Sequence, residues 1–159
     1  MALGGKEAFY TALADELAAL LDGERDPIAN AANTAALAYD RLEHVNWAGF
    51  YFLRGGELVV GPFQGKPACV RIPLGKGVCG TAAQRRTTVV VPDVHAFPGH
   101  IACDANSRSE IVVPVIDGSR LAGVLDIDSP VLGRFDAHDA AGLAHMVRVF
   151  QSATALDTL

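Results

Sequence analysis

Three cysteines are the residues of this chain that could carry covalent chemistry. Cys103 stands in the polar stretch 99–106, beside a histidine and an aspartate. Structural cysteines prefer apolar elements, so this setting favours a solvent-reachable nucleophile whose reactivity depends on its thiolate fraction. Cys79 opens an expected helix, where unpaired N–H groups favour a negative charge, and Cys69 just precedes an expected strand. The simpler alternative is that all three are buried small hydrophobic residues, and composition alone favours it.

Two acids close together end an apolar stretch. Asp126 and Asp128 are two residues apart, so in an extended strand they point to the same face. Two carboxylates on one face need a bound cation, an amino group or a shared proton. Glu110 begins the neighbouring expected strand and could join them. The alternative is a pair of solvated acids at a strand end, and these residues alone do not decide between the two.

An aromatic pair and two histidines complete the candidate site residues. Trp47 and Tyr51 lie four apart in an expected strand, hence on one face. Core packing is the simpler interpretation, and a wall for a small ligand with a cationic or polarizable group is the functional one. His95 and His100 are interpreted as solvated loop residues.

The cysteine spacing argues against a metal centre. The intervals are about ten and twenty-four residues, from 69 to 79 and from 79 to 103. A structural zinc site usually contains a close C-x2-4-C or H-x3-5-H pair. A magnesium or calcium site would need more oxygen ligands than the acids offer. We therefore expect no metal and no bound cofactor.

Hydrophobic periodicity predicts the elements that position these residues. Two hairpins are expected, turned at 54–56 and 117–118. The predicted helices cover 6–21, 26–42, 77–86 and a stretch from about 136, and the predicted strands cover 47–53, 57–63, 70–74, 87–91, 110–116 and 121–127. Hairpins flanked by helices predict an antiparallel sheet in an α+β sandwich.

One motif suggests a different fold. Residues 75–80 satisfy G-x-G-x-x-G, which follows a strand and opens a helix as a dinucleotide fingerprint does. However, the hairpin at 117–118 breaks the βαβ alternation that a Rossmann sheet requires. The glycines are better explained by a tight turn into the helix that presents Cys79.

Composition limits the possible classes of protein. The chain has 159 residues, 50% hydrophobic and 19% charged, which fits one domain with its own core. No apolar run reaches the roughly 18 residues that a spanning helix needs, and the acidic first helix is unlike an export signal. We therefore expect a cytoplasmic protein, where a structural disulfide framework is unusual. A net charge of −5 and a pI of about 5.4 disfavour nucleic acid as a partner.

Six stretches, in order along nearly the whole chain, resemble the free methionine-R-sulfoxide reductases. They are NWAGFY (46–51), GPFQGKPAC (61–69), GVCGTAA (77–83), HIACDA (100–105), SEIVVP (109–114) and GVLDIDSP (123–130). The resemblance implies a single GAF domain over 1–159, with a central antiparallel sheet and helices packed around it, generally homodimeric. Its parts would be N-terminal helices at about 5–43, sheet and active-site loops at about 46–130, and a C-terminal helix at about 136–157.

The resemblance also implies roles for the residues. Cys103 would attack the sulfoxide, Cys69 is the expected resolving cysteine, and Cys79 is an auxiliary or alternative one. The implied substrate-binding residues are Trp47, Tyr51, Glu110, Asp126 and Asp128. The implied reaction reduces free L-methionine-R-sulfoxide to methionine and leaves a disulfide, which thioredoxin or a similar dithiol reduces.

Two other classes of function remain as alternatives. A non-catalytic GAF module would bind a small ligand without turning it over, and it would have no evident need for three thiols beside an acid cluster. A thiol peroxidase or disulfide exchanger would want a close pair such as C-x-x-C, and the sequence has none. A turnover assay with the sulfoxide separates these classes.

Overall fold

Along the sequence, helices at both ends of the chain flank a series of short strands. The computed structural model describes residues 3–101 and 105–159. Its elements in chain order are α1 (Leu3–Leu20), α2 (Pro27–Arg41), β1 (Trp47–Arg54), β2 (Glu57–Gly65), β3 (Arg71–Pro73), α3 (Gly77–Arg85), β4 (Val89–Val91), η1 (Val94–Ala96), β5 (Ser109–Asp117), β6 (Arg120–Ser129), α4 (Ala137–Ala153) and η2 (Leu156–Thr158). The predicted helices and strands are confirmed, with bounds that differ by a few residues.

The strands form one sheet in the order β3-β2-β1-β6-β5-β4. Every pair of neighbouring strands in it is antiparallel. The two predicted hairpins, β1–β2 and β5–β6, lie side by side because β1 pairs with β6. The α+β prediction of an antiparallel sheet with helices packed around it is therefore confirmed.

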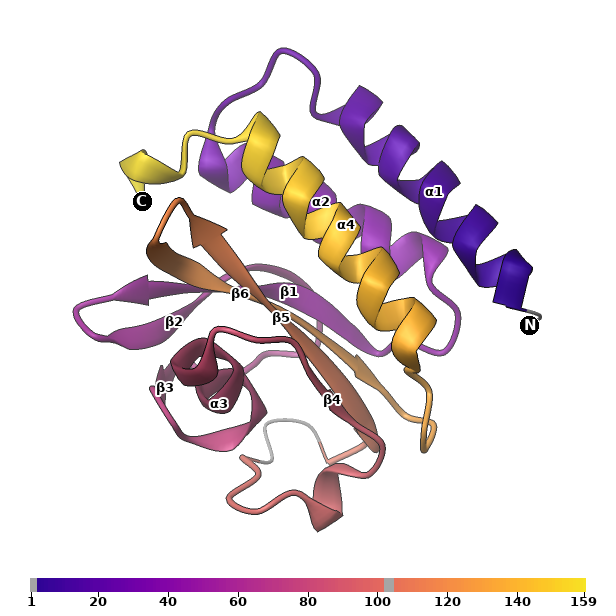
Figure 1. Cartoon of the computed structure of the whole chain (residues 1–159). Helices are drawn as coiled ribbons and strands as arrows, with labels where there is room; N and C mark the ends of the chain where they lie inside the picture. The colour runs from indigo at the N-terminus through magenta and orange to yellow at the C-terminus, as the bar shows by residue number, and fades with distance from the viewer. Residues whose placement is uncertain (1–2, 102–104) are drawn as a thin grey trace.

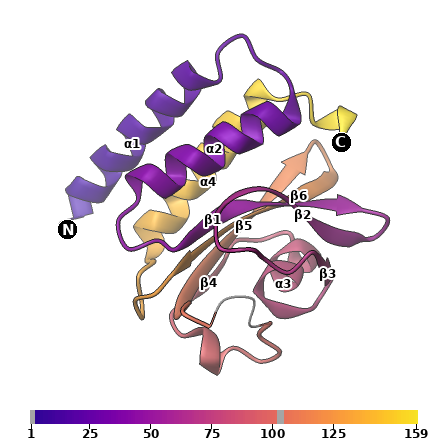
Figure 2. The same ribbon diagram turned by 180° about the vertical axis from the view of Figure 1, so that it is seen from behind.

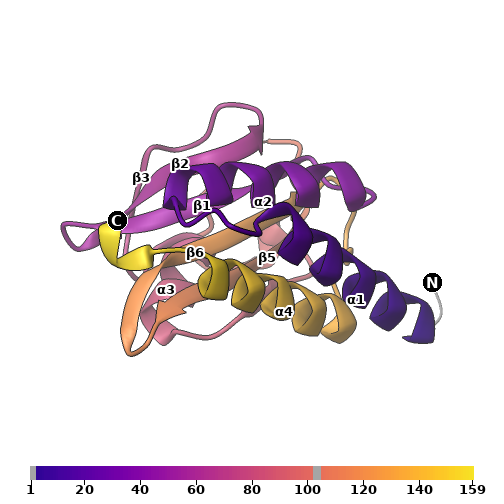
Figure 3. The same cartoon turned by 90° about the horizontal axis from the view of Figure 1, so that it is seen from above.

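The two faces of the sheet have different covers (Figures 1 and 2). Helices α1, α2 and α4 lie over one face, and α3 with the segments around β3 and β4 lies over the other. Seen from above, α2 and α4 run across the sheet and α1 packs alongside α4 (Figure 3). Alternation along β1 sends Phe50 and Phe52 into the helical core and Trp47 and Tyr51 into a second core around α3.

Local sequence signals fix where the helices begin. Asp26 caps α2 by accepting from the backbone N–H of Ala29, and a proline follows it at the first helical position. Asp136 and Asp139 form a reciprocal capping box at the start of α4. Within the described residues, no helix is both long and apolar enough to cross a bilayer.

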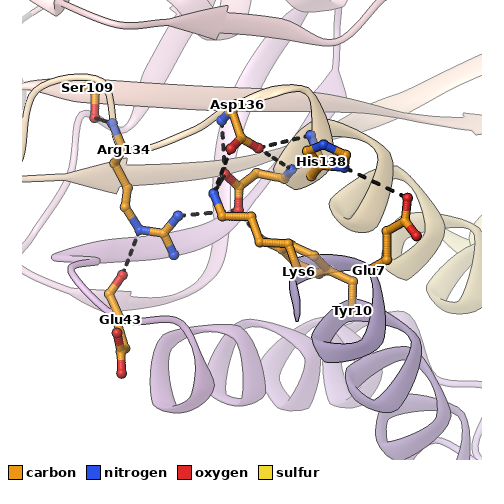
Figure 4. Close-up of polar contacts among 9 residues, drawn as sticks. Lys6, Glu7, Tyr10, Glu43, Ser109, Arg134, Asp136 and His138 are labelled. Carbon is orange, nitrogen blue, oxygen red and sulfur yellow. Dashed lines mark hydrogen bonds and ion pairs between the residues drawn. The ribbon is translucent and has the colours of Figure 1, made fainter. Parts of the chain in front are cut away.

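A buried charged cluster fastens α1 to α4 (Figure 4). The Asp139 carboxylate accepts from Lys6 Nζ at 2.6 Å, from Tyr10 Oη at 2.7 Å and from Arg134 at 3.3 Å. Burial lowers the pKa of Lys6, but its hydrogen bonds to Asp139 and Asp136 outweigh this effect and raise the pKa above its ordinary value. Gly142 on α4 lets the Tyr10 ring lie close, since a Cβ there would meet that ring at 2.1 Å.

The approach to α3 needs glycines for backbone reasons. Gly75 and Gly77 have φ angles of 81° and 62°, in the left-handed region that favours glycine. A Cβ on Gly80 would lie 2.4 Å from the carbonyl oxygen of Pro73. The G-x-G-x-x-G pattern is thus accounted for by a tight turn, and the antiparallel sheet provides no Rossmann βαβ unit.

Candidate active site

Strand register gathers the acids on the face that α3 covers. Asp128 on β6 is paired with Glu110 on β5 and with Trp47 on β1. Paired residues of neighbouring strands point to the same face, so these three side chains form a row across the sheet. Asp126, two residues before Asp128, lies on that face too. The prediction that Glu110 joins the two aspartates is confirmed.

Burial changes the proton affinity of these acids. Glu110 is 7% exposed and Asp126 is 5% exposed. Burial raises the pKa of Glu110 well above its ordinary value, and the neighbouring charges of Asp126 and Asp128 raise it further. Burial also raises the pKa of Asp126, although hydrogen bonds from Glu110 and Cys79 oppose the shift. The cluster therefore holds a proton more tightly than solvated carboxyls do.

An aromatic wall stands beside the acids. Trp47 stacks on Tyr51 with ring centroids 5.8 Å apart, and on Phe63 with centroids 5.1 Å apart. Gly49 lies between the first two along β1, where a Cβ would approach the Trp47 ring to 2.9 Å. Core packing is confirmed for the aromatic pair, and the same two rings also line a cavity. Phe63 and Gly49 were missed from sequence, since their part depends on the pairing of β1 with β2.

The wall also holds the segment that carries Cys69. Trp47 Nε1 donates to the carbonyl oxygen of Lys66 at 3.1 Å, and Tyr51 Oη donates to that of Cys69 at 3.1 Å. These two hydrogen bonds tie residues 66–69, which follow β2, to the face of β1. The backbone at Cys69 is thus positioned by the same residues that form the wall.

The acids, the wall and Cys79 line one cavity. About 40 Å³ of it can be occupied by the centre of a water-sized molecule, and about 540 Å³ lies between the lining atoms when space open to solvent is included. Its other lining side chains come from the loop before β3, from β3, from the start of α3 and from the loop before β5: Pro67, Ala68, Ile72, Lys76, Val78, His100, Ile101 and Ser107. A small polar molecule entering here would meet carboxyls on one side and aromatic rings on another.

The three cysteines differ in their surroundings. Cys103, the predicted nucleophile, lies outside the described residues. Cys69 is half-buried and disulfide-bonded. Cys79 is a free thiol, 4% exposed, with its Sγ 3.9 Å from Glu110 Oε2.

The expectation that the helix start favours an ionised Cys79 is wrong. Burial raises the pKa of this thiol well above its ordinary value, and the acids Asp126 and Glu110 raise it further. A helix N-terminus typically contributes about 0.3–1 kcal/mol to an anion, whereas burying an ion costs several kcal/mol. Desolvation therefore outweighs the helix dipole, and the thiol stays protonated.

His100 is a site residue that the sequence interpretation placed in solvent. Its side chain is 16% exposed, it lines the cavity, and its Nε2 lies 4.0 Å from Glu110 Oε1. Burial lowers the pKa of His100, and the nearby His95 lowers it further. His95 itself is a solvated residue as predicted, with a side chain 68% exposed. Only the path of the loop distinguishes them, so no sequence signal separated the two histidines.

This arrangement suits a reaction that needs both a proton donor and a binding site for a cation. A carboxylic acid kept neutral by burial can protonate a developing oxyanion. The other carboxylates, when ionised, can hold a positively charged group, and the stacked rings can pack against a methyl or thioether group. Among the described cysteines, Cys79 lines the cavity, and Ala68, the neighbour of Cys69, lines it too.

Comparisons with known proteins agree with the geometry. The GAF domain model matches residues 7–153. The free methionine-R-sulfoxide reductase of Escherichia coli is 55% identical over 142 residues, covering 89% of this chain and 86% of that protein. The solved structure of the Staphylococcus aureus fRMsr in complex with substrate has a TM-score of 0.87 at 52% identity and covers 91% of this chain and 94% of that one. The Neisseria meningitidis free methionine-R-sulfoxide reductase in complex with its substrate has a TM-score of 0.89 at 45% identity, covering 93% and 89%.

Proposed function

The chain belongs to the GAF-domain family and, within it, to the free methionine-R-sulfoxide reductases, and from this premise we propose that it reduces free L-methionine-R-sulfoxide to methionine in the cavity beside Trp47. The observation that carries the proposal is the carboxyl of Glu110. Burial raises its pKa well above the ordinary value, and it lines a cavity with an aromatic wall. A sulfoxide needs such a donor, because its oxygen must gain a proton before its sulfur accepts a thiolate readily.

The chemical steps balance with the residues of this chain. The Cys103 thiolate attacks the sulfoxide sulfur while Glu110 gives a proton to the oxygen. The OH group then passes to the Cys103 sulfur as the substrate's S–O bond and the transient S–S bond break, so methionine leaves and Cys103 is oxidised to a sulfenic acid. The thiol of Cys69 then condenses with the sulfenic acid, which forms a disulfide and releases water. Two thiols are thus oxidised for each sulfoxide reduced.

The remaining acids select a free amino acid. Asp126 and Asp128 lie in the same cluster as Glu110, and Asp126 is buried with an oxygen that accepts no hydrogen bond from the described residues. An ammonium group would satisfy such an oxygen. A methionine sulfoxide inside a polypeptide offers a neutral amide instead, and this would leave the carboxylates uncompensated. We therefore assign Asp126 and Asp128 to the α-ammonium.

Cys69 is the proposed resolving residue. Its disulfide and its half-buried position support this role. Cys79, by contrast, is a buried free thiol with a raised pKa. Because a thiol must ionise to react, this protonated group is the poorer resolving partner.

The family resemblance is the basis for proposing a reductant, an assembly and a location. We propose thioredoxin or a similar dithiol as the reductant, no bound cofactor, a homodimeric assembly and a cytoplasmic location. A dithiol can reduce the Cys69–Cys103 disulfide by exchange through a mixed disulfide. Cys69 is half-buried, whereas Cys79 is buried, which favours Cys69 as the residue that such a partner reaches.

A coupled assay tests the proposal. The protein is mixed with thioredoxin, its reductase and NADPH, and then with the R or the S epimer of free methionine sulfoxide. Only the R epimer should cause NADPH oxidation, and a ligand-binding module without catalysis would cause none with either epimer. Cys103→Ser should abolish turnover, whereas Cys69→Ser should still release about one equivalent of methionine per site. Full activity in Cys103→Ser would overturn the choice of nucleophile.

A further inference from the structure

Three potential metal ligands meet in the cavity from three different elements. Cys79 comes from α3, Glu110 from β5 and Asp126 from β6, and one ligand atom from each lies within 4.8 Å of the other two. All three residues are buried. One thiolate with two carboxylates is a donor set that zinc accepts, and three protein ligands with an open fourth position are common in accessible zinc sites. The close-pair rule could not find this set, because its members are far apart in sequence.

A second observation points to a bound cation. Asp126 is 5% exposed, and its Oδ1 accepts no hydrogen bond from any residue in the ranges 3–101 and 105–159. Within those ranges, His100 Nε2 lies 4.0 Å from Glu110 Oε1. Neither Glu110 nor Asp126 forms an ion pair with a lysine or arginine there. A buried carboxylate oxygen left in this way is costly unless a positive charge reaches it.

We propose that Cys79, Glu110 and Asp126 bind a Zn²⁺ ion that occupies the substrate cavity and so blocks it. Zinc forms one bond to the Cys79 sulfur and one to an oxygen of each acid, and the thiol proton and any carboxyl proton leave to solvent. No atom changes oxidation state. Bond lengths of about 2.0–2.3 Å place tetrahedral ligand atoms roughly 3.3–3.8 Å apart. Side-chain rotations that move the ligand atoms by about 1 Å therefore close the site.

The donor set favours zinc over the abundant divalent ions. Magnesium and calcium prefer six or more oxygen ligands, whereas a thiolate selects softer ions. The bound ion would occupy Asp126, which is also assigned to the substrate ammonium. Zinc and substrate should therefore exclude each other. Metal binding is independent of the proposed function, and only the exclusion rests on it.

The test uses a full-length protein in which Cys79 is the sole cysteine. The other two thiols would themselves bind zinc, so the background is the double variant Cys69→Ser, Cys103→Ser. Cobalt(II) replaces zinc as a spectroscopic probe, because a thiolate ligand gives a charge-transfer band and tetrahedral geometry gives strong visible bands. We expect one Co²⁺ per chain, displaced by Zn²⁺ but not by Mg²⁺.

Matched variants locate the ion. In this background, adding Cys79→Ser should remove the charge-transfer band, and Glu110→Gln or Asp126→Asn should weaken cobalt binding at least about tenfold. Glu57→Gln, an exposed strand glutamate away from the cavity, should leave binding unchanged. Circular dichroism checks that each variant is folded. Absence of a cobalt band in the double variant, or a band that persists without Cys79, would overturn the proposal.

Competition with substrate separates this inference from the proposed function. The double variant cannot turn the substrate over, so free L-methionine-R-sulfoxide can be titrated as a ligand. Trp47, the single tryptophan, lies in the cavity and reports its binding by fluorescence without metal. If the substrate binds and displaces cobalt, zinc and substrate share the cavity. If it binds without displacing cobalt, the blocking role is wrong, and if it does not bind at all, the proposed function fails instead.

Discussion

Replacing Glu110 by glutamine removes the proposed proton donor with almost no change in shape. The glutamine amide keeps the volume of the carboxyl and can still form hydrogen bonds within the cluster, but it cannot deliver a proton to the sulfoxide oxygen. General acid catalysis by a positioned side chain is typically worth about 10²–10⁴-fold in rate. We therefore expect the first release of methionine from the reduced enzyme to slow by roughly that factor.

The same substitution should make the protein more stable at alkaline pH. Burial raises the folded-state pKa of Glu110 above its ordinary value of 4.5, so between 4.5 and the raised value the native state keeps a proton that the unfolded chain has lost. The free energy of unfolding therefore falls as the pH rises from 4.5 to the raised folded value. Each tenfold difference in proton affinity is worth about 1.4 kcal/mol. Glutamine does not ionise, so the variant escapes this loss.

Two measurements check this prediction together. Rapid-quench assays of a single turnover avoid the disulfide-reduction steps and follow the rate against pH. The wild-type rate should fall on the alkaline side as Glu110 ionises, and the Gln variant should lack that limb. Thermal melts should give matching midpoints at acidic pH and a growing advantage for the variant as pH rises. The control is Glu57→Gln, whose exposed pair with Arg71 contributes little.

Either of two results would refute the reasoning about Glu110. If the Gln variant releases methionine at the wild-type rate, another group supplies the proton. If the variant is less stable than wild type at every pH, the carboxyl of Glu110 is ionised in the native state and serves as a structural anion. If the Gln variant loses activity but its rate still falls at alkaline pH, the loss reflects altered packing and not a missing acid.

Three further predictions concern the parts that hold the site. Gly49→Ala should cost about 1–3 kcal/mol in urea unfolding and raise KM, because its Cβ would lie 2.3 Å from the Cβ of Phe63 and press on the aromatic wall; an unchanged midpoint would show that β2 yields there. Tyr51→Phe removes the hydrogen bond to the Cys69 carbonyl, so disulfide formation after the first turnover should slow more than methionine release, and equal slowing would contradict this. Asp139→Asn removes the buried carboxylate that Lys6 and Arg134 share and leaves Lys6 only its pair with Asp136, so it should cost about 3–5 kcal/mol in urea unfolding, with kcat of the folded enzyme unchanged.

Local signals in the sequence were enough for most of the fold. The caps at Asp26 and Asp136, the glycine turns of the two hairpins and the alternation along β1 act over a few residues, so their effect could be predicted directly. The order of the strands depends on which hairpins pair, and periodicity does not encode it. The pairing of β1 with β6 is visible only in the folded chain.

The site was predictable where neighbours in sequence are neighbours in space. Asp126 and Asp128 share a face for reasons of strand geometry alone. Glu110 needed the register of β5 against β6, and His100 needed the path of a long loop, so the former was a hypothesis and the latter was misplaced. The six motifs of the resemblance supplied what local physics could not, because they link all these residues to one family.

Desolvation underlies the different roles proposed for Glu110 and Cys79. Burial raises the pKa of Glu110, as the proposed donor role requires, and the same burial with the same acids raises the pKa of the Cys79 thiol. Cys69 lies in the half-buried segment tied to Tyr51 and is in a disulfide. Under the proposed mechanism, the acid cluster promotes sulfoxide reduction and keeps the neighbouring Cys79 thiol protonated. A soft metal ion can reverse the second effect, because it replaces the proton that burial holds on the sulfur.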